Sequence, residues 1–418
     1  MSRSSAQSPT QSIASYLVII ADDLTGAADS AARARQAGLA AWVLLEDAAW
    51  PERLQTPAAV ALSTDSRHLA PEEAAARVTA SLAWLPALPA VRWYKKIDST
   101  LRGHIGAEVD AMLAWLGEGA VAVICPAFPA QRRGLADGYL VHADTPPRSV
   151  HLPTLLRGQS RHAVAAVDLA TVEAGRDRLE AALVAAQQEG ARLVVVDALE
   201  ERHLETIAAA AQGALAAPLL CGSAGLVGVL SSQLAGATPA AVSAPWPAGG
   251  PVLGVVGSGS PMAHRQIEQV ARRGDVRVRS LDRTWSTVDV VSPGTQPAGN
   301  WLLHLEPPPA GLSLEGPLAR AEAARLADLT QVMVQRMHPA SLIVVGGDTA
   351  TYVLRVLGIR RLEVIEELLP GIPLTVGEDS RGDPRAVVLK PGNFGDDGTL
   401  AALYDRLAQP SEVRLRTI

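Results

Sequence analysis

Short runs of β-branched and other apolar residues alternate with alanine-rich stretches along nearly the whole of this 418-residue chain. Apolar runs of four to six residues are typical of buried strands, and alanine-rich stretches of a dozen residues are typical of helices. Regular alternation of the two predicts a mostly parallel sheet with helices on both faces. The fold class is therefore expected to be α/β.

The predicted elements fall into two series. The first has strands at 17–20, 42–45, 58–62, 93–97, 120–124, 193–196 and 219–220, and helices at 25–37, 71–82, 104–116, 172–188 and 200–215. The second has strands at 252–256, 302–305, 342–345 and 386–389, and a long helix at 318–337. Residues 126–165 are polar without clear periodicity, which predicts a long loop of the kind that often carries function.

Two series of elements, in a chain too long for one ordinary core, predict two domains. Residues 1–15 are rich in Ser and Gln and are expected to be a disordered tail. Residues 16–235 form the first α/β domain, and the stretch 236–251, rich in Ala, Pro and Gly, is the linker. Residues 252–410 form the second domain, and each domain is expected to be a mostly parallel sheet flanked by helices.

Charge and hydropathy exclude several classes of partner. The net charge is −6 without a block of like charges, which argues against binding to nucleic acid. No apolar stretch approaches the ~20 residues of a membrane span, and no signal-peptide pattern precedes the first strand. We therefore expect a cytoplasmic protein without a membrane partner. Cys125 and Cys221 each follow an apolar run and are expected to be buried at strand ends.

Polar clusters follow several predicted strands of the first domain, where open α/β sheets bind their ligands. Asp22 and Asp23 follow the first strand, and the alternative is that Asp23 or Thr25 caps the next helix. Arg67 follows the strand at 58–62, where a solvated loop arginine is the alternative. The densest cluster spans 95–104, and a surface salt-bridge patch is its alternative. Its lysines, acid, hydroxyls and Arg102 suit an anionic substrate whose hydroxyl loses a proton.

Glycine-rich turns follow strands of the second domain at 257–261, 346–350 and 390–395, and a fourth occurs at 222–225. Glycine lets the backbone approach a phosphate, and a following helix offers free N–H donors. Such glycines also serve ordinary tight turns, and neither a Walker A loop nor a GxGxxG fingerprint is present. Three such turns in one domain nevertheless indicate a nucleotide.

Taken together, these segments resemble the four-carbon acid sugar kinase family, whose members phosphorylate threonate, erythronate or 3-oxo-tetronate. The resemblance extends from about Tyr16 to Tyr404, and its matching pieces are 21–27, 95–103, 126–129, 222–226, 257–260, 346–350 and 390–395. It implies an N-terminal domain that binds the sugar acid and a C-terminal domain that binds the nucleotide.

The resemblance also implies the contacts, residue by residue. The expected substrate contacts are Asp22, Arg67, Lys96, Ile97, Asp98 and Ser99, to which the dense cluster adds Arg102. The expected ATP contacts are Ser258, Gly346, Gly347, Asp348, Thr349 and a glycine of the last loop, Gly392 or Gly395. The chain departs from the family at His104, where Asn is usual, and at 131–134 and 142–144, which puts the identity of the substrate in doubt.

Phosphoryl transfer to an alcohol needs an aligned hydroxyl, a proton acceptor and cations on the phosphates. The hypothesis is an ATP-dependent kinase that phosphorylates the terminal hydroxyl of a four-carbon sugar acid. Arg67 and Lys96 hold the acid, and Asp98 or Asp22 accepts the proton. The glycine loops hold ATP with Mg²⁺, and Asp348 either assists the metal or caps a helix. Closure of the two domains is expected to exclude water.

Two other functions fit the same pattern. One is a different nucleotide-dependent enzyme, such as a dehydrogenase or a ligase, although the missing GxGxxG weakens the dehydrogenase. The other is a two-lobed binding protein that closes on a sugar acid without catalysis. ATP consumption that depends on a sugar acid separates the three. The metal ligands, the particular acid and whether the chain forms a homo-oligomer do not follow from the sequence.

Overall fold

The structure, a computed structural model, describes residues 16–52, 54, 56–88, 90–142, 150–236, 246, 249–282, 297–306 and 316–408. The expected disordered tail, most of the expected linker, the departures at 143 and 144 and the last two residues of the expected second domain lie outside these ranges.

The first domain is built on eight parallel strands in the order β2-β3-β1-β4-β10-β5-β9-β8. Their bounds are β1 (Tyr16–Ala21), β2 (Ala40–Leu44), β3 (Ala58–Ser63), β4 (Val91–Lys96), β5 (Val121–Cys125), β8 (Ala163–Val167), β9 (Ala191–Val196) and β10 (Pro218–Gly222). Strands β3 and β5 are buried at every position, because helices cover both faces of the sheet.

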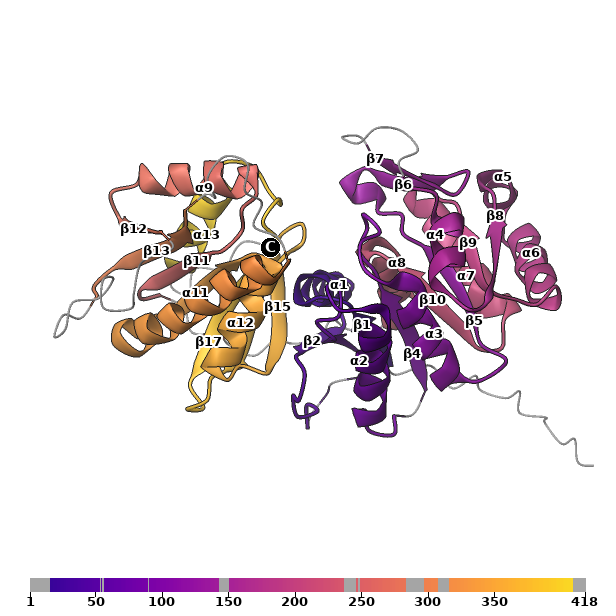
Figure 1. The fold of residues 1–418 in the computed structure, drawn as a ribbon, viewed down its shortest axis with the longest axis horizontal. Coiled ribbons are helices and arrows are strands. Elements are labelled where there is room, and N and C mark those ends of the chain that lie inside the picture. Colours follow the sequence, from indigo (N-terminus) through magenta and orange to yellow (C-terminus); the bar gives the residue numbers. More distant parts are fainter. Residues whose placement is uncertain are drawn as a thin grey trace, which may run out of the picture.

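Helices on the two faces complete two separate apolar layers. One face carries α1 (Leu24–Gln36), α6 (Arg176–Gln188), α7 (Glu201–Ala214) and α8 (Ala224–Ala235), with α5 (Leu169–Glu173) beside them. The other carries α2 (Pro71–Trp84), α3 (Ile105–Leu116) and α4 (Leu152–Gln159). Figure 1 shows this domain as the body that contains the N-terminal half of the sequence.

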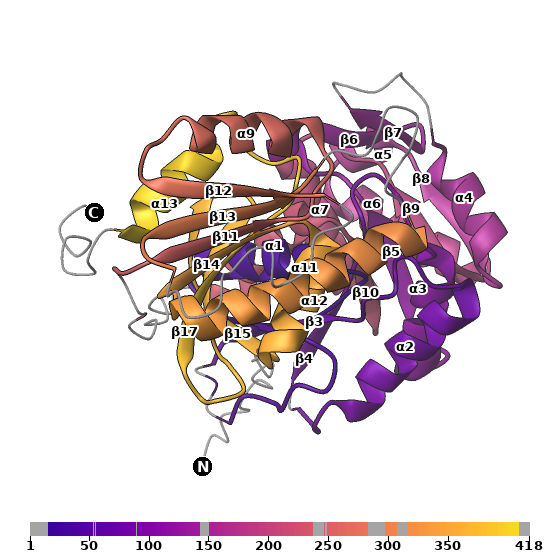
Figure 2. The ribbon, with the colours of Figure 1, turned by 60° about the vertical axis from the view of Figure 1, so that its left-hand side comes forward.

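The second domain has a mixed sheet in the order β12-β13-β11-β14-β17-β16-β15. The strands are β11 (Val252–Val256), β12 (Val276–Leu281), β13 (Asn300–Leu305), β14 (Ser341–Val345), β15 (Arg361–Leu369), β16 (Ile372–Glu378) and β17 (Pro384–Lys390). Strand β16 is antiparallel to both of its neighbours. Helices α11 (Gly316–Met337) and α12 (Gly347–Leu357) cover one face, and α9 (Pro261–Ala271) and α13 (Thr399–Ala408) cover the other (Figure 2).

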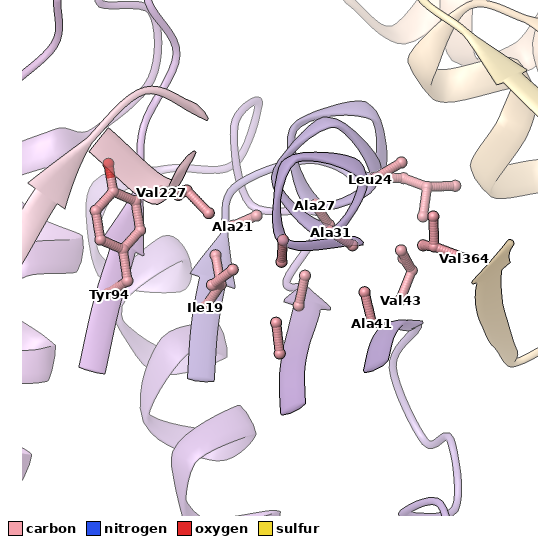
Figure 3. Close-up of a cluster of buried hydrophobic side chains, with 14 of the residues drawn as sticks. Ile19, Ala21, Leu24, Ala27, Ala31, Ala41, Val43, Tyr94, Val227 and Val364 are labelled. Atoms are coloured by element: carbon pink, nitrogen blue, oxygen red, sulfur yellow. The ribbon is translucent and has the colours of Figure 1, made fainter. Parts of the chain in front are cut away.

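The two sheets are joined edge to edge into one sheet of 15 strands. Strand β15 pairs with β2 in antiparallel register, with Leu362 opposite Val43. Helix α1 covers this junction, and Figure 3 shows its Leu24 beside Val43 of β2 and Val364 of β15. A motion that parted the domains would break main-chain hydrogen bonds and expose this shared core. The pairing therefore holds the two domains together at this edge, and the closure expected to exclude water remains a prediction.

The polar stretch at 126–165 is more ordered than the expected loop. It contains a 3₁₀ helix (Pro129–Gln131), the hairpin of β6 (Arg133–Ala136) and β7 (Tyr139–His142), helix α4 and the start of β8. Asp137 and Gly138 form the hairpin turn with positive φ angles of 52° and 72°. Asp-Gly is a strong signal for a two-residue hairpin turn, and this signal was overlooked.

Further differences between the expected and the observed elements concern single helices and strands. The helix expected at 172–188 is broken by Gly175, whose φ of 100° separates α5 from α6. Strand β15 was missed because its glutamates and leucines favour a helix, and pairing on both sides overrides that preference. Strands β12 and β16 and helices α8 and α13 were also missed.

Candidate functional site

One cavity lies between the two domains, at the carboxyl ends of β1, β3 and β4. We call it the interdomain cavity. Its charged lining residues are Asp23, Asp29, Arg67, Lys96, Asp98, Arg102 and Arg133. Pro391, Asn393 and Phe394 of the loop after β17 line it from the second domain. Residues far apart in sequence thus share one cavity, as the strand-end clusters predicted.

Arg67 holds the two adjacent aspartates that follow β1. Its Nε and Nη2 donate to Asp22 Oδ2 and Oδ1 at 2.8 and 2.9 Å, and its Nη1 donates to Asp23 Oδ2 at 2.7 Å. Burial alone would raise the pKa of Asp22, but Arg67 and the neighbouring lysines outweigh it and lower that pKa. The cation that balances the aspartates therefore comes from the protein.

Asp23 also caps α1. Its Oδ1 accepts the Gly26 N–H at 2.8 Å, and its Oδ2 accepts the Thr25 hydroxyl at 2.6 Å. The capping role and the place at the cavity are thus combined in one side chain. Arg67 uses three of its N–H donors on the aspartates, so its planar edge is not open to a ligand carboxylate. Its role as a substrate contact remains a prediction.

Asp98 is fixed by its own loop. It accepts hydrogen bonds from the Thr100 hydroxyl and from Arg102, whose Nε lies 2.5 Å away. Burial would raise the pKa of Asp98, but Arg102, Arg67 and Thr100 together lower it. Asp98 therefore holds a stable negative charge and is a weak base. Ser99, next in the chain, accepts a hydrogen bond from Arg133 Nη1.

Two consecutive lysines at the end of β4 point in opposite directions, as strand geometry requires. Lys96 lines the cavity, with its Nζ 3.0 Å from the carbonyl oxygen of Ile97. Ile97 itself is buried, so of its atoms only the backbone is suited to contact a ligand. Lys95 is fully buried and forms an ion pair of 2.6 Å with Glu108 of α3.

Glu108 was missed by the sequence analysis. It is buried in the interior, and its other oxygen accepts the Ser66 hydroxyl at 2.6 Å. Ser66 immediately precedes Arg67, so the buried pair supports the loop that carries this arginine. A glutamate inside an otherwise apolar stretch of α3 was the available signal. His104 precedes α3 as its N-cap residue and makes no side-chain capping bond.

The glycine-rich turns of the second domain meet at the carboxyl ends of the adjacent strands β11, β14 and β17. A Cβ on Gly257 would overlap the Thr349 hydroxyl, and one on Gly392 would overlap Ser258. Gly346 has a φ of 111° and lies against Ser258. The predicted ATP contacts Ser258, Gly346, Thr349 and Gly392 are therefore brought together. Gly395 lies in the loop before α13, where a Cβ would overlap Thr399, the first residue of that helix.

The first turn of α12 faces the aspartates of the first domain. A Cβ on Gly347 would lie 3.5 Å from Asp23 Oδ2 and 3.6 Å from Thr25 Oγ1. Asp348 Oδ1 is 3.9 Å from His68 Nε2. The two predicted sets of contacts, for the acid and for the nucleotide, are thus next to each other.

Comparison with known proteins identifies the relatives of this chain. The family model described as a sugar-binding N-terminal domain matches residues 17–230, and the one described as a nucleotide-binding C-terminal domain matches residues 309–400. A D-threonate kinase of Bordetella bronchiseptica is 34% identical, with 92% of this chain and 96% of the relative covered. The chain belongs to the four-carbon acid sugar kinase family.

Other members of this kinase family act on different acids. A D-erythronate kinase of Heliobacterium modesticaldum is 32% identical over 85% of this chain and 89% of the relative. A 3-oxo-tetronate kinase of Pectobacterium atrosepticum is 28% identical over 94% of this chain and 99% of the relative. The crystal structure of a Salmonella typhimurium LT2 protein has a TM-score of 0.75 and 26% identity, covering 94% of this chain and 99% of its own.

Three further features of this sugar acid kinase concern metal ions, membranes and the two cysteines. Within the described ranges, no group of three or more His, Cys, Asp or Glu side chains is placed to hold a metal ion, and no helix is long and apolar enough to cross a membrane. Cys125 and Cys221 are buried at strand ends, as predicted. Burial raises the pKa of both thiols to about 12.

Lys390 is a buried cation of this kinase that the sequence analysis did not single out. It is the last residue of β17, and its Nζ donates to the Pro391 carbonyl at 3.0 Å. Burial lowers the pKa of Lys390 to about 8, and no carboxylate in the described part of the chain counteracts that shift. An unbalanced cation beside the glycine loops suits a phosphate ligand.

Replacement of Lys390 by methionine is expected to stabilise the free protein by roughly 1–3 kcal/mol at pH 7, because a desolvated charge is removed. The folded-state pKa lies below the unfolded one, so the penalty exists below about pH 8 and fades as the pH rises toward 10.5. Urea unfolding of wild type and Lys390→Met at pH 7 and at pH 10 measures the stability difference with the penalty present and with it largely lost. A Lys390→Met protein that is less stable than wild type at pH 7 contradicts the assignment.

Proposed function

We propose that this protein transfers the γ-phosphate of ATP to the terminal hydroxyl of a four-carbon sugar acid, one of threonate, erythronate and 3-oxo-tetronate. The observation that carries the proposal is the position of Gly347 against Asp23 and Thr25. It supports the proposal because the first turn of α12, which follows one of the glycine loops, lies against the aspartates that follow β1. The acceptor and the donor of a phosphoryl group must meet in this way.

The interdomain cavity suits an anion with several hydroxyls. Four cations and three carboxylates are among the described residues that line it. Arg102 uses its Nε on Asp98, and neither of its Nη groups donates to a described residue. We assign the carboxylate of the substrate to Arg102 and Lys96 and its hydroxyls to Asp23 and Ser99. Arg67 then acts chiefly by fixing the aspartates, and Asp22 and Asp98 act as oriented charges.

The nucleotide phosphates lie, in this proposal, over the loops that contain Ser258, Gly346 and Gly392, with Lys390 below them. Backbone N–H groups at the start of α9 and α12 are directed toward that position. Mg²⁺ supplies positive charge to the phosphates when it is bound. Asp348 fits a role as a metal contact, because it is about one-third exposed and its Oδ1 lies 3.9 Å from His68 Nε2.

The decisive experiment measures ADP release with D- and L-threonate, D- and L-erythronate and 3-oxo-tetronates. One of these acids is expected to be turned over with a kcat/KM roughly 10–100 times that of threitol or erythritol, because charge-assisted hydrogen bonds contribute about 1.5–3 kcal/mol. Calorimetric binding of an acid without any ADP release favours a non-catalytic binding protein. Equal use of acid and polyol contradicts an acid-specific site.

A further inference from the structure

Asp29 is a buried carboxylate that the sequence analysis did not select. It lies on α1, one turn after Gly26, and lines the interdomain cavity. Its side chain is 7% exposed, and no described residue donates a hydrogen bond to its Oδ1. A buried polar atom without a partner destabilises the folded state, and at the wall of a cavity a bound ligand can supply the missing partner.

The surroundings of Asp29 come from both domains. A Cβ on Gly371, in the turn between β15 and β16, would lie 3.6 Å from Asp29 Oδ1 and would overlap the ring of Phe394. Phe394 belongs to the same loop as Gly392, which packs against Ser258. Asp29 thus lies where the loop that borders the nucleotide reaches the sugar-binding domain.

The other aspartates at the cavity differ from Asp29 in their contacts. Asp22 and Asp23 accept hydrogen bonds from Arg67, and Asp98 accepts them from Arg102 and Thr100. Arginine stabilises the negative charge of all three, although Asp98 Oδ1 accepts no described hydrogen bond. Asp29 has a buried oxygen without a described hydrogen bond and makes no described ion pair with an arginine, so it is the carboxylate best suited to accept a proton.

We propose that Asp29 is the general base of the kinase and removes the proton from the substrate hydroxyl that becomes phosphorylated. This inference rests on the proposed function. As the hydroxyl oxygen forms its bond to the γ-phosphorus, its O–H bond breaks and the proton moves to Asp29. The bond from the γ-phosphorus to the β–γ bridging oxygen breaks, and ADP leaves with that electron pair. Asp29 then releases the proton to solvent.

The electrostatics of Asp29 agree with this role. Burial raises the pKa of Asp29 to about 6, Lys96 and Arg33 oppose the rise, and Glu367 and Asp23 add to it. A base with a pKa just below the working pH is ionised and still accepts a proton readily.

The test compares Asp29→Asn with two other single substitutions. Asp29→Asn is expected to lower kcat roughly 10²–10⁴-fold and to leave the affinities for the acid and for a non-hydrolysable ATP analogue within about threefold. Asp197→Asn is the matched control, because Asp197 is also buried with a raised pKa but lies outside the cavity. It should keep the wild-type kcat. Asp98→Asn should chiefly raise KM for the acid.

The pH dependence of kcat/KM provides a second test, and its first part uses the wild-type enzyme alone. In wild type, kcat/KM for the acid should increase about tenfold per pH unit below about pH 6 and level off above it. This rise of kcat/KM with pH, the acid limb of the profile, should persist in Asp197→Asn and disappear in Asp29→Asn. A wild-type profile without the limb overturns the proposal, and so does a limb that persists in Asp29→Asn.

The outcomes separate this inference from the proposed function. If wild type releases no ADP with any acid, the proposed function fails, and the inference that rests on it falls too. If wild type is active and Asp29→Asn keeps kcat within about tenfold, only the assignment of Asp29 is overturned. If Asp29→Asn raises KM for the acid at unchanged kcat, Asp29 binds substrate and is not the base.

Discussion

Gly392→Ala is expected to weaken nucleotide binding by roughly 10–100-fold while the affinity for the sugar acid is retained. The new Cβ would overlap the Ser258 hydroxyl and lie 2.7 Å from the Ser258 Cβ. Ser260, which caps α9, donates a hydrogen bond to the Gly392 carbonyl at 2.7 Å. The loops 257–261, 346–350 and 390–395 contact one another at this point. The added methyl group is therefore expected to displace more than the loop that carries it.

Calorimetric titration with a non-hydrolysable ATP analogue, followed by titration with the preferred acid, measures both affinities. Gly274→Ala is the control, because a Cβ at Gly274 would have no described atom within 4 Å. It should bind both ligands as wild type does. Wild-type nucleotide affinity in Gly392→Ala would place the nucleotide away from these loops, and loss of both affinities would indicate a general folding defect.

Lys95→Met is expected to lower the free energy of unfolding by roughly 3–5 kcal/mol. Lys95 and Glu108 are both almost completely inaccessible to solvent, and their ion pair measures 2.6 Å. Removal of the lysine leaves a buried carboxylate without its cation, which costs far more than the pair itself contributes. The pair also supports Ser66, so the loop that carries Arg67 should become less ordered.

The control for this substitution is the next residue. Lys96 makes no ion pair within the described part of the chain, so Lys96→Met should lower stability by less than Lys95→Met does, while it weakens acid binding. The double variant Lys95→Met/Glu108→Gln should recover most of the loss, since no charge stays buried and the amide oxygen still accepts from Ser66. Urea unfolding compares all three. A double variant no more stable than Lys95→Met contradicts the explanation.

The strands of the fold were predictable where a short apolar run in the sequence is also buried on both faces of the sheet. The buried runs of β1, β3, β5 and β14 were recognised because parallel strands covered on both faces are apolar throughout. Strand β15 was not, since its residues favour a helix and only its two neighbours make it a strand. Its edge-to-edge pairing with β2 is a long-range contact, which no local sequence pattern predicts.

The sequence predicted the site as a set of polar clusters after strands. It did not predict which of these residues contact each other. Arg67 and Asp22 were both selected, but the sequence did not reveal that they bind each other. Asp29 was passed over because a single aspartate on an alanine-rich helix resembles a solvated residue. The turn that contains Gly371, more than 300 residues later in the chain, lies against its carboxylate.

The pairing of β2 with β15 has a consequence for synthesis and unfolding. On the ribosome, the first domain is complete long before residues 361–363 emerge, and until then the edge of β2 and one side of α1 have no cover. An open strand edge is a template for wrong pairing with other chains. Once the second domain has arrived, its loss would expose apolar residues of the first, so the two halves gain and lose their stability as one cooperative unit.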